Sequence, residues 1–139
     1  MVKRFFIGVA TCILGFAAYA VASISVAAVL QFVVSIPFVG AILSFPSTPA
    51  LYVMSLSLSS GAIASIMVCE KISKSNNIWL SRVIFYAYMA INGVVPSIRE
   101  FSSSGFSDYF WATAIMSFIY MEHLFVAFSE RNKRKDEEN

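Results

Sequence analysis

Glu122 and His123 are the residues of this chain whose chemistry fits least well into an apolar environment. They are neighbours in the last apolar stretch, about six residues and therefore roughly 9 Å from its expected cytoplasmic end. A carboxyl group and an imidazole can take up and release protons, so proton transfer is the first chemistry to consider. An ionisable side chain at the centre of a membrane helix costs about 2.5–3.5 kcal/mol, which makes such a residue a functional candidate.

The two side chains do not form one site, because successive residues of a helix point about 100° apart. His123 shares a helical face with small and partly polar residues: Ala112, Thr113, Met116, Tyr120 and Ala127. Glu122 shares a face with bulky apolar residues: Trp111, Ile115, Phe118 and Phe125. We expect His123 to pack against other helices, hydrogen-bonded to Tyr86 or to a serine, with a role in proton transfer as the alternative. We expect Glu122 to face lipid, where its carboxyl group is protonated, directed toward the headgroups, or covered by another subunit.

Three further polar side chains are candidates for function or contact inside the membrane: Tyr86, Asn92 and Gln31. Tyr86 is expected at the depth of His123, whereas Gln31 and Asn92 are expected nearer the outer side. Interhelical hydrogen bonds, worth about 0.6–2 kcal/mol each, explain such residues without any substrate.

The motifs of known enzyme and metal sites are missing from the sequence. One histidine and two cysteines 57 positions apart, Cys12 and Cys69, cannot supply the three or four ligands of a metal site, nor two histidines for haem. There is no GxSxG, HExxH or phosphate-binding glycine loop. We therefore expect neither catalysis nor a metal or cofactor, and a net charge of +2 is too small to indicate a nucleic-acid partner.

The charge pattern predicts that lipid surrounds most of the chain. No Lys, Arg, Asp, Glu or His occurs in the 65 residues from Phe5 through Cys69. Charged residues make up 13% of the chain, against about 25% in an average soluble domain. About 20 apolar residues in a helix cross the hydrocarbon core once. The sequence therefore predicts an all-α, polytopic bundle of membrane-spanning helices.

Four clusters of charge and polar residues divide the apolar sequence into four expected crossings. These spans lie near 5–30, 49–69, 79–98 and 109–128, and a charged cytoplasmic tail follows at 129–139. Four crossings put nine of the ten Lys and Arg residues on one side, with only Arg99 on the other. The positive-inside rule then places both termini in the cytoplasm, with the plasma membrane as the default compartment. Because the tail holds four basic and four acidic residues, we expect it to attract anionic lipid only weakly.

Two segments allow more than one interpretation. The apolar stretch 31–46 is either an overlong end of the first helix, broken at Pro37 and followed by an interfacial segment, or a re-entrant hairpin. Residues 18–20 imitate the small-x-small cleavage site of a secretory signal. We favour a retained first span, because residues 21–36 are as apolar as those before them.

Small residues at helical spacing predict close contacts between the spans. They are Gly8, Gly15 and Ala22 in the first span, Ser57, Gly61 and Ser65 in the second, and Gly93 in the third. These seams predict a tight left-handed bundle with the first two spans at its centre. The alternative is that the serines of the second span line a water-filled path, although serine readily bonds to its own helix backbone.

Three functions fit these patterns. The first is a small multi-pass membrane protein that acts by helix contact with another membrane protein or its own copies, as an accessory subunit or an assembly or protective/exclusion factor. The second is a small oligomeric proton-coupled transporter or exporter in which Glu122 or His123 handles protons. The third is a holin-like permeabilising protein. We favour the first, because the predicted loops are too short to hold a catalytic domain and Glu122 could face a partner.

Overall fold

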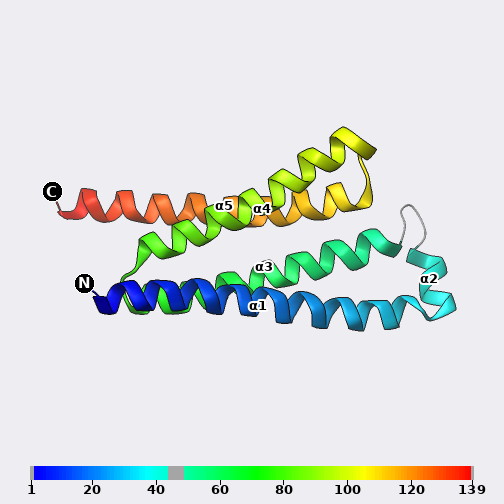
Figure 1. The fold of residues 1–139 in the computed structure, drawn as a ribbon, viewed down its shortest axis with the longest axis horizontal. Coiled ribbons are helices and arrows are strands. Elements are labelled where there is room, and N and C mark those ends of the chain that lie inside the picture. Colours follow the sequence, from blue (N-terminus) through cyan, green and yellow to red (C-terminus); the bar gives the residue numbers. More distant parts are fainter. Residues whose placement is uncertain (1, 44–48, 139) are drawn as a thin grey trace.

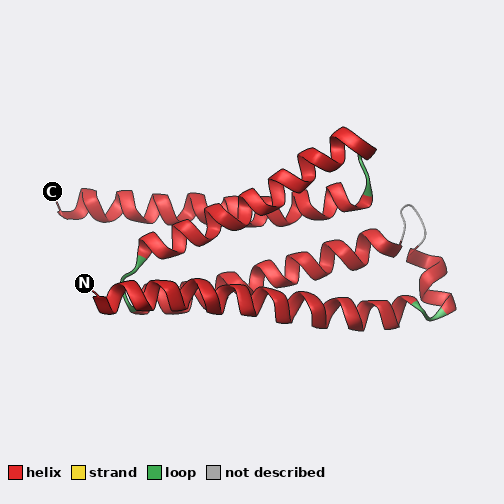
Figure 2. Cartoon of the chain, in the orientation of Figure 1, coloured by secondary structure: helices red, strands yellow, loops and turns green. Residues whose placement is uncertain are grey.

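The computed structural model describes residues 2–43 and 49–138, and every element in these ranges is helical (Figure 2). The helices are α1 (Val2–Val34), α2 (Pro37–Leu43), α3 (Pro49–Ser75), α4 (Trp79–Ser104) and α5 (Asp108–Glu138). The expected all-α fold is therefore confirmed for the described ranges.

The four long helices run back and forth in chain order, so that both termini lie at the same end of the molecule (Figure 1). Helix α1 packs along α3, α4 packs along α5, and α3 contacts α5 between these two pairs. Helix α2 lies at the opposite end, where the chain passes from α1 to α3 (Figure 1). Lys3 and Arg4, the end of α3, the start of α4 and the end of α5 therefore share one end of the bundle.

Three of the described helices, α1, α3 and α5, are long and apolar enough to cross a membrane. At 1.5 Å per residue, the 33 residues of α1 span about 50 Å, more than the roughly 30 Å of a hydrocarbon core. Helix α4, with 26 residues, is not one of these three, and its polar residues include Arg82, Asn92, Arg99 and Glu100.

The turns between the helices follow from local sequence. Helix α3 ends in a Schellman motif: Asn77 adopts φ 53°, and the Ile78 N–H donates to the Ser73 carbonyl over 2.9 Å. Ser107 caps α5, since its Oγ accepts a hydrogen bond of 3.2 Å from the Phe110 N–H. The connections between α3, α4 and α5 are short, so consecutive helices lie antiparallel.

The helices differ in length from the spans expected from the sequence. Helix α4 continues past Pro96 to Ser104, and α5 continues to Glu138, so residues 129–138 of the expected charged tail are helical. In the stretch 31–46, α1 ends at Val34 and α2 begins at Pro37, a residue suited to the first helical position. Residues 44–46 of that stretch lie outside the described residues.

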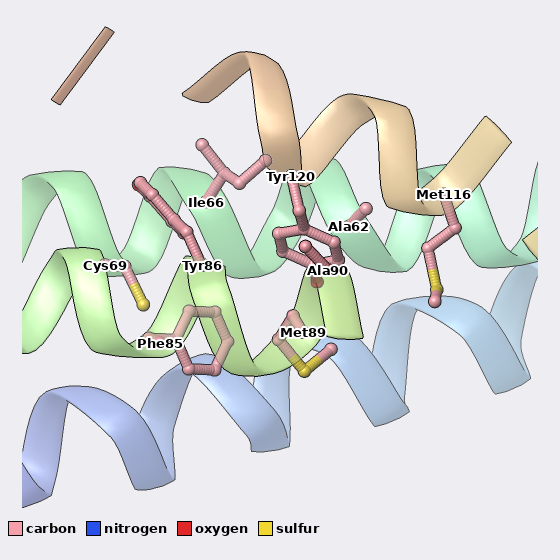
Figure 3. Close-up of a cluster of buried hydrophobic side chains, with 9 residues drawn as sticks. All are labelled: Ala62, Ile66, Cys69, Phe85, Tyr86, Met89, Ala90, Met116 and Tyr120. Atoms are coloured by element: carbon pink, nitrogen blue, oxygen red, sulfur yellow. The ribbon is translucent and has the colours of Figure 1, made fainter. Parts of the chain in front are cut away.

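The buried core is built by α3, α4 and α5 (Figure 3). Its members are Ala62, Ile66, Cys69, Phe85, Tyr86, Met89, Ala90, Met116 and Tyr120. Helix α1 buries only Thr11 and Gly15, so the expectation that the first span lies at the centre of the bundle is wrong. The reason is that α1 offers one narrow strip of small residues to α3 and α4, while its other faces carry large apolar side chains that point outward.

The glycines singled out in the sequence lie at helix contacts of different tightness. A Cβ atom added to Gly15 would lie 2.6 Å from Cys69 Sγ, one on Gly61 2.8 Å from the Tyr19 carbonyl oxygen, and one on Gly93 2.9 Å from Met116 Cε. A Cβ atom on Gly8 would only make an ordinary contact, 3.5 Å from Ser81 Cβ. Three close approaches therefore leave no room for a side chain.

The remaining small residues predicted at helix contacts, Ala22, Ser57 and Ser65, differ in burial. Ala22 is half-buried, whereas Ser57 and Ser65 are buried. Ser57 Oγ donates to the Val53 carbonyl and Ser65 Oγ to the Ala62 carbonyl of their own helix, at 2.5 and 2.8 Å. These hydroxyl groups are satisfied without water, which favours packing over a polar path.

Candidate functional site

Charged side chains from three helices meet at the end of the bundle that holds the termini. Arg82 of α4 lies between Glu70 of α3 and Glu130 of α5. Its Nε is 2.7 Å from Glu70 Oε1, as an ion pair and not an aligned hydrogen bond, and its Nη2 donates to Glu130 Oε2 over 2.9 Å. The Arg82 side chain is 5% exposed, against 20% and 37% for the two glutamates, so the guanidinium is the buried centre of the group.

Two more side chains complete this cluster, which we call the Arg82 network. Lys74 Nζ lies 2.9 Å from Glu70 Oε2 and 3.5 Å from Glu130 Oε1, and its side chain is about half exposed. The Tyr86 hydroxyl donates to Glu70 Oε1 over 2.6 Å. Two carboxylates therefore balance two cations, and the carboxylate nearest the core also receives a phenol hydrogen bond.

Helical spacing and short turns assemble the network. Glu70 and Lys74, and likewise Arg82 and Tyr86, are four residues apart and so share a helical face. The turn after Ser75 brings the end of α3 to the start of α4. A buried ion pair of this kind adds little net stability to the fold, but arrangements that leave one of its charges unpaired are strongly disfavoured. We therefore interpret the network as fixing the relative positions of α3, α4 and α5.

Glu122 lies on the outer surface of α5, as the sequence predicted. It is exposed, and the side chains on its face are also exposed, Phe118 by 69% and Phe125 by 74%. The face that His123 shares with Met116, Tyr120 and Ala127 is instead mostly buried. The assignment of the two faces is confirmed.

His123 does not make the expected hydrogen bond to Tyr86 or to a serine. Its Nδ1 lies 3.1 Å from the Ile119 carbonyl oxygen of its own helix, and its ring meets the Tyr86 ring edge-on with the centroids 6.1 Å apart. The Tyr86 hydroxyl points to Glu70 instead, because a carboxylate is a stronger acceptor than an imidazole nitrogen.

Asn92 and Gln31 are both exposed, and they are not brought into the Arg82 network. Asn92 Nδ2 donates over 2.9 Å to the Tyr88 carbonyl of its own helix, so the expected interhelical bond is wrong for this residue. Gln31 lines a shallow apolar depression between the end of α1 and the start of α3, beside Pro49 and Val53.

In the sequence, Glu70, Lys74, Arg82 and Glu130 belong to the charged clusters that mark the ends of the expected spans, and no contact among them was predicted. The four-residue spacings of Glu70 with Lys74 and of Arg82 with Tyr86 were a signal that could have indicated pairing. The contact with Glu130 had no local signal, because 48 positions separate it from Arg82.

No known protein family, curated protein or solved structure matches this chain.

Proposed function

We propose that this chain is a small integral protein of the plasma membrane that crosses the bilayer four times and acts by helix contact with another membrane-embedded chain. It works as an accessory subunit or as an assembly or protective/exclusion factor, and both of its termini lie in the cytoplasm. Three sets of observations support the number of crossings, the orientation and the mode of action.

The packing of α4 supports a fourth crossing. Helix α4 runs antiparallel to α5 along its length and buries Phe85, Met89 and Gly93, so it belongs inside the bundle and not on a membrane surface. Its uncharged stretch 83–98 spans about 24 Å. At one end of this stretch Arg82 is paired with Glu70 and Glu130, and at the other end the exposed Arg99 can reach the headgroups of a core about 30 Å thick.

The distribution of cations supports cytoplasmic termini. The fold gathers nine of the ten Lys and Arg residues at the end that holds the termini and leaves Arg99 at the other (Figure 1). The end richer in Lys and Arg stays in the cytoplasm during membrane insertion.

The single observation that carries the contact function is the position of Glu122. Lipid tails satisfy the large apolar side chains that cover the outside of the bundle, but they cannot satisfy a carboxyl group. Glu122 is exposed on an apolar face of α5 and makes no hydrogen bond or ion pair with any described residue. A hydrogen-bond donor from a second membrane-embedded chain would offset the free-energy cost of holding the carboxyl group in apolar surroundings. Lipid headgroups are too far away to do so, because their level is near Glu130, about 12 Å farther along α5.

Site-specific photo-crosslinking in native membranes tests the proposal. A photoreactive amino acid at Phe118, one turn from Glu122, should yield a protein adduct that identifies either a second copy or a different membrane protein. The same group at Ile91, which is 60% exposed on α4, is the matched control and should react only with lipid. Adducts with lipid alone at both positions would refute the proposal.

Replacing Glu122 separates contact from transport. Glu122→Gln keeps a hydrogen-bonding group, so it should weaken the Phe118 adduct without removing it. A proton-coupled transporter would instead lose proton flux completely in reconstituted vesicles carrying this variant. A holin-like protein would collapse the membrane potential on induced expression, whereas a contact protein should leave the potential unchanged.

A further inference from the structure

A pocket of about 210 Å³ lies beside the Arg82 network, between the end of α3, the start of α4 and the helical extension of α5. Its walls carry five basic side chains and one carboxylate. The basic residues are Lys74, Arg82, Arg131, Arg134 and Lys135, and the carboxylate is Glu130. We call this hollow the basic pocket.

The arginines of the basic pocket are held in place by the protein. The Arg131 guanidinium lies 4.0 Å from the centroid of the Trp79 ring, in a cation–π contact. Arg134 Nη1 donates to Asn77 Oδ1 over 3.2 Å. Each contact uses only part of a guanidinium with five N–H donors, so further donors remain for a ligand and little side-chain entropy is lost when it binds.

Arg131 and Arg134 bring positive charge to the basic pocket, and the contacts described above join them to the uncharged Trp79 and Asn77. Both oxygens of Glu130 already contact Arg82 and Lys74, and Glu70 pairs with the same two cations. The acidic residues Asp136 and Glu137 do not line the pocket. The N-terminus of α4 also borders it, and Ile78 offers no side-chain oxygen to the free N–H groups of that first turn.

We propose that the basic pocket binds a phosphate group. Paired arginine forks match the geometry of phosphate oxygens, and basic pockets between membrane helices on the cytoplasmic side recognise lipid headgroups. Trp79 is suited to the level of the headgroups, which places the pocket within reach of a lipid phosphate as well as of soluble phosphate. Phosphate binding would be separate from the contact function. It would give stronger attraction to anionic lipid than the balanced charge of the tail predicts, because the helical extension of α5 turns its arginines toward the pocket.

Fluorescence of Trp79 in the full chain provides the test. The chain contains two tryptophans, so Trp111→Phe leaves Trp79 as the single probe, in contact with Arg131. The protein in dodecyl maltoside micelles, which contain no phosphate, is titrated with short-chain phosphatidylglycerol and, separately, with inorganic phosphate. Saturation by the lipid alone identifies a headgroup phosphate, and saturation by inorganic phosphate identifies a soluble one. Saturation by neither overturns the proposal.

A pair of matched variants separates the pocket from net charge. Arg131→Gln with Arg134→Gln removes two charge-assisted hydrogen bonds and should weaken binding about a hundredfold. Lys71→Gln with Lys133→Gln removes the same charge from exposed residues at the same end, outside the pocket, and should weaken binding only a few-fold. Equal losses in the two variants would refute a specific pocket. Both pairs lie near helix ends, and protection of the buried Cys69 thiol verifies that each variant is folded.

Discussion

Glu70→Gln is the substitution that most directly tests the Arg82 network as a tie between three helices. Glutamine has nearly the shape of glutamate, and its amide oxygen can still accept the hydrogen bond from the Tyr86 hydroxyl, 2.6 Å away in the native protein. What is lost is the negative charge 2.7 Å from Arg82 Nε. The substitution therefore removes charge with little change in packing.

The expected loss of stability follows from the burial of the two partners. Removing the only partner of a buried charge costs about 3–5 kcal/mol. Arg82 keeps its 2.9 Å contact with Glu130, which is more exposed than Glu70, so we expect a smaller loss of about 2 kcal/mol. Lys74 is half exposed and adds little to this figure. The population of unfolded protein should rise about 30-fold at equilibrium.

Reactivity of the Cys69 thiol measures this equilibrium, because Cys69 is fully buried in the core. Cys12 is partly exposed and is replaced by alanine in every variant, so that only unfolding exposes a thiol to maleimide. The fraction labelled is followed in mixed micelles as the share of denaturing detergent increases. Glu137→Gln, at an exposed position of the α5 extension, is the matched control and should change stability by less than about 0.5 kcal/mol.

Equal unfolding curves for Glu70→Gln and Glu137→Gln would refute the reasoning. That result would mean that Arg82 is satisfied by Glu130 alone, so the contact with Glu70 does not tie α3 to α4.

Three other predictions follow from the same structure. Gly61→Ala should lower the free energy of unfolding by about 1–3 kcal/mol, because the added methyl group overpacks against α1. Gly8→Ala has room for the methyl group and should raise the free energy of unfolding by up to about 1 kcal/mol through helix propensity. A stabilised Gly61→Ala would contradict the close contact. Tyr120→Phe removes a buried 2.7 Å hydrogen bond to Ser65 and should lower the free energy of unfolding, measured by Cys69 labelling, by about 1 kcal/mol. An unchanged unfolding curve would count against that bond. In a cysteine-free chain, cysteines introduced at Ser75 and at Ser103 should be labelled from opposite sides of the membrane, and equal labelling from one side would refute the four crossings.

Periodicity was sufficient to separate the two faces of α5. Residues three and four positions apart share a helical face, so the bulky set around Glu122 and the small set around His123 could be assigned without knowing any neighbour. The same logic could not find the partner of a side chain, and the predicted bonds of His123 and Asn92 were wrong for that reason. Both side chains use a carbonyl of their own helix, an acceptor that every helical sequence supplies.

The role of α1 also depended on information outside its own sequence. Gly8, Gly15 and Ala22 form a regular strip of small residues, yet only Gly15 among them is buried. A strip of small residues permits close approach but does not state which helix approaches or along how much of its length. In this fold α3 and α4 each contact part of the strip, and the buried core forms between α3, α4 and α5.

An uncharged stretch of 65 residues is enough to predict helices that are long and apolar enough to cross a membrane, because hydrocarbon excludes charged groups. Helical periodicity then assigns the faces, since it depends only on residues a few positions apart. The Arg82 network and the basic pocket needed the folded bundle, because Glu70, Arg82 and Arg131 come from three helices and meet only when the ends of those helices are packed together. The interaction energy of such a cluster depends on distances between residues that are far apart in the sequence, and no local sequence pattern specifies those distances.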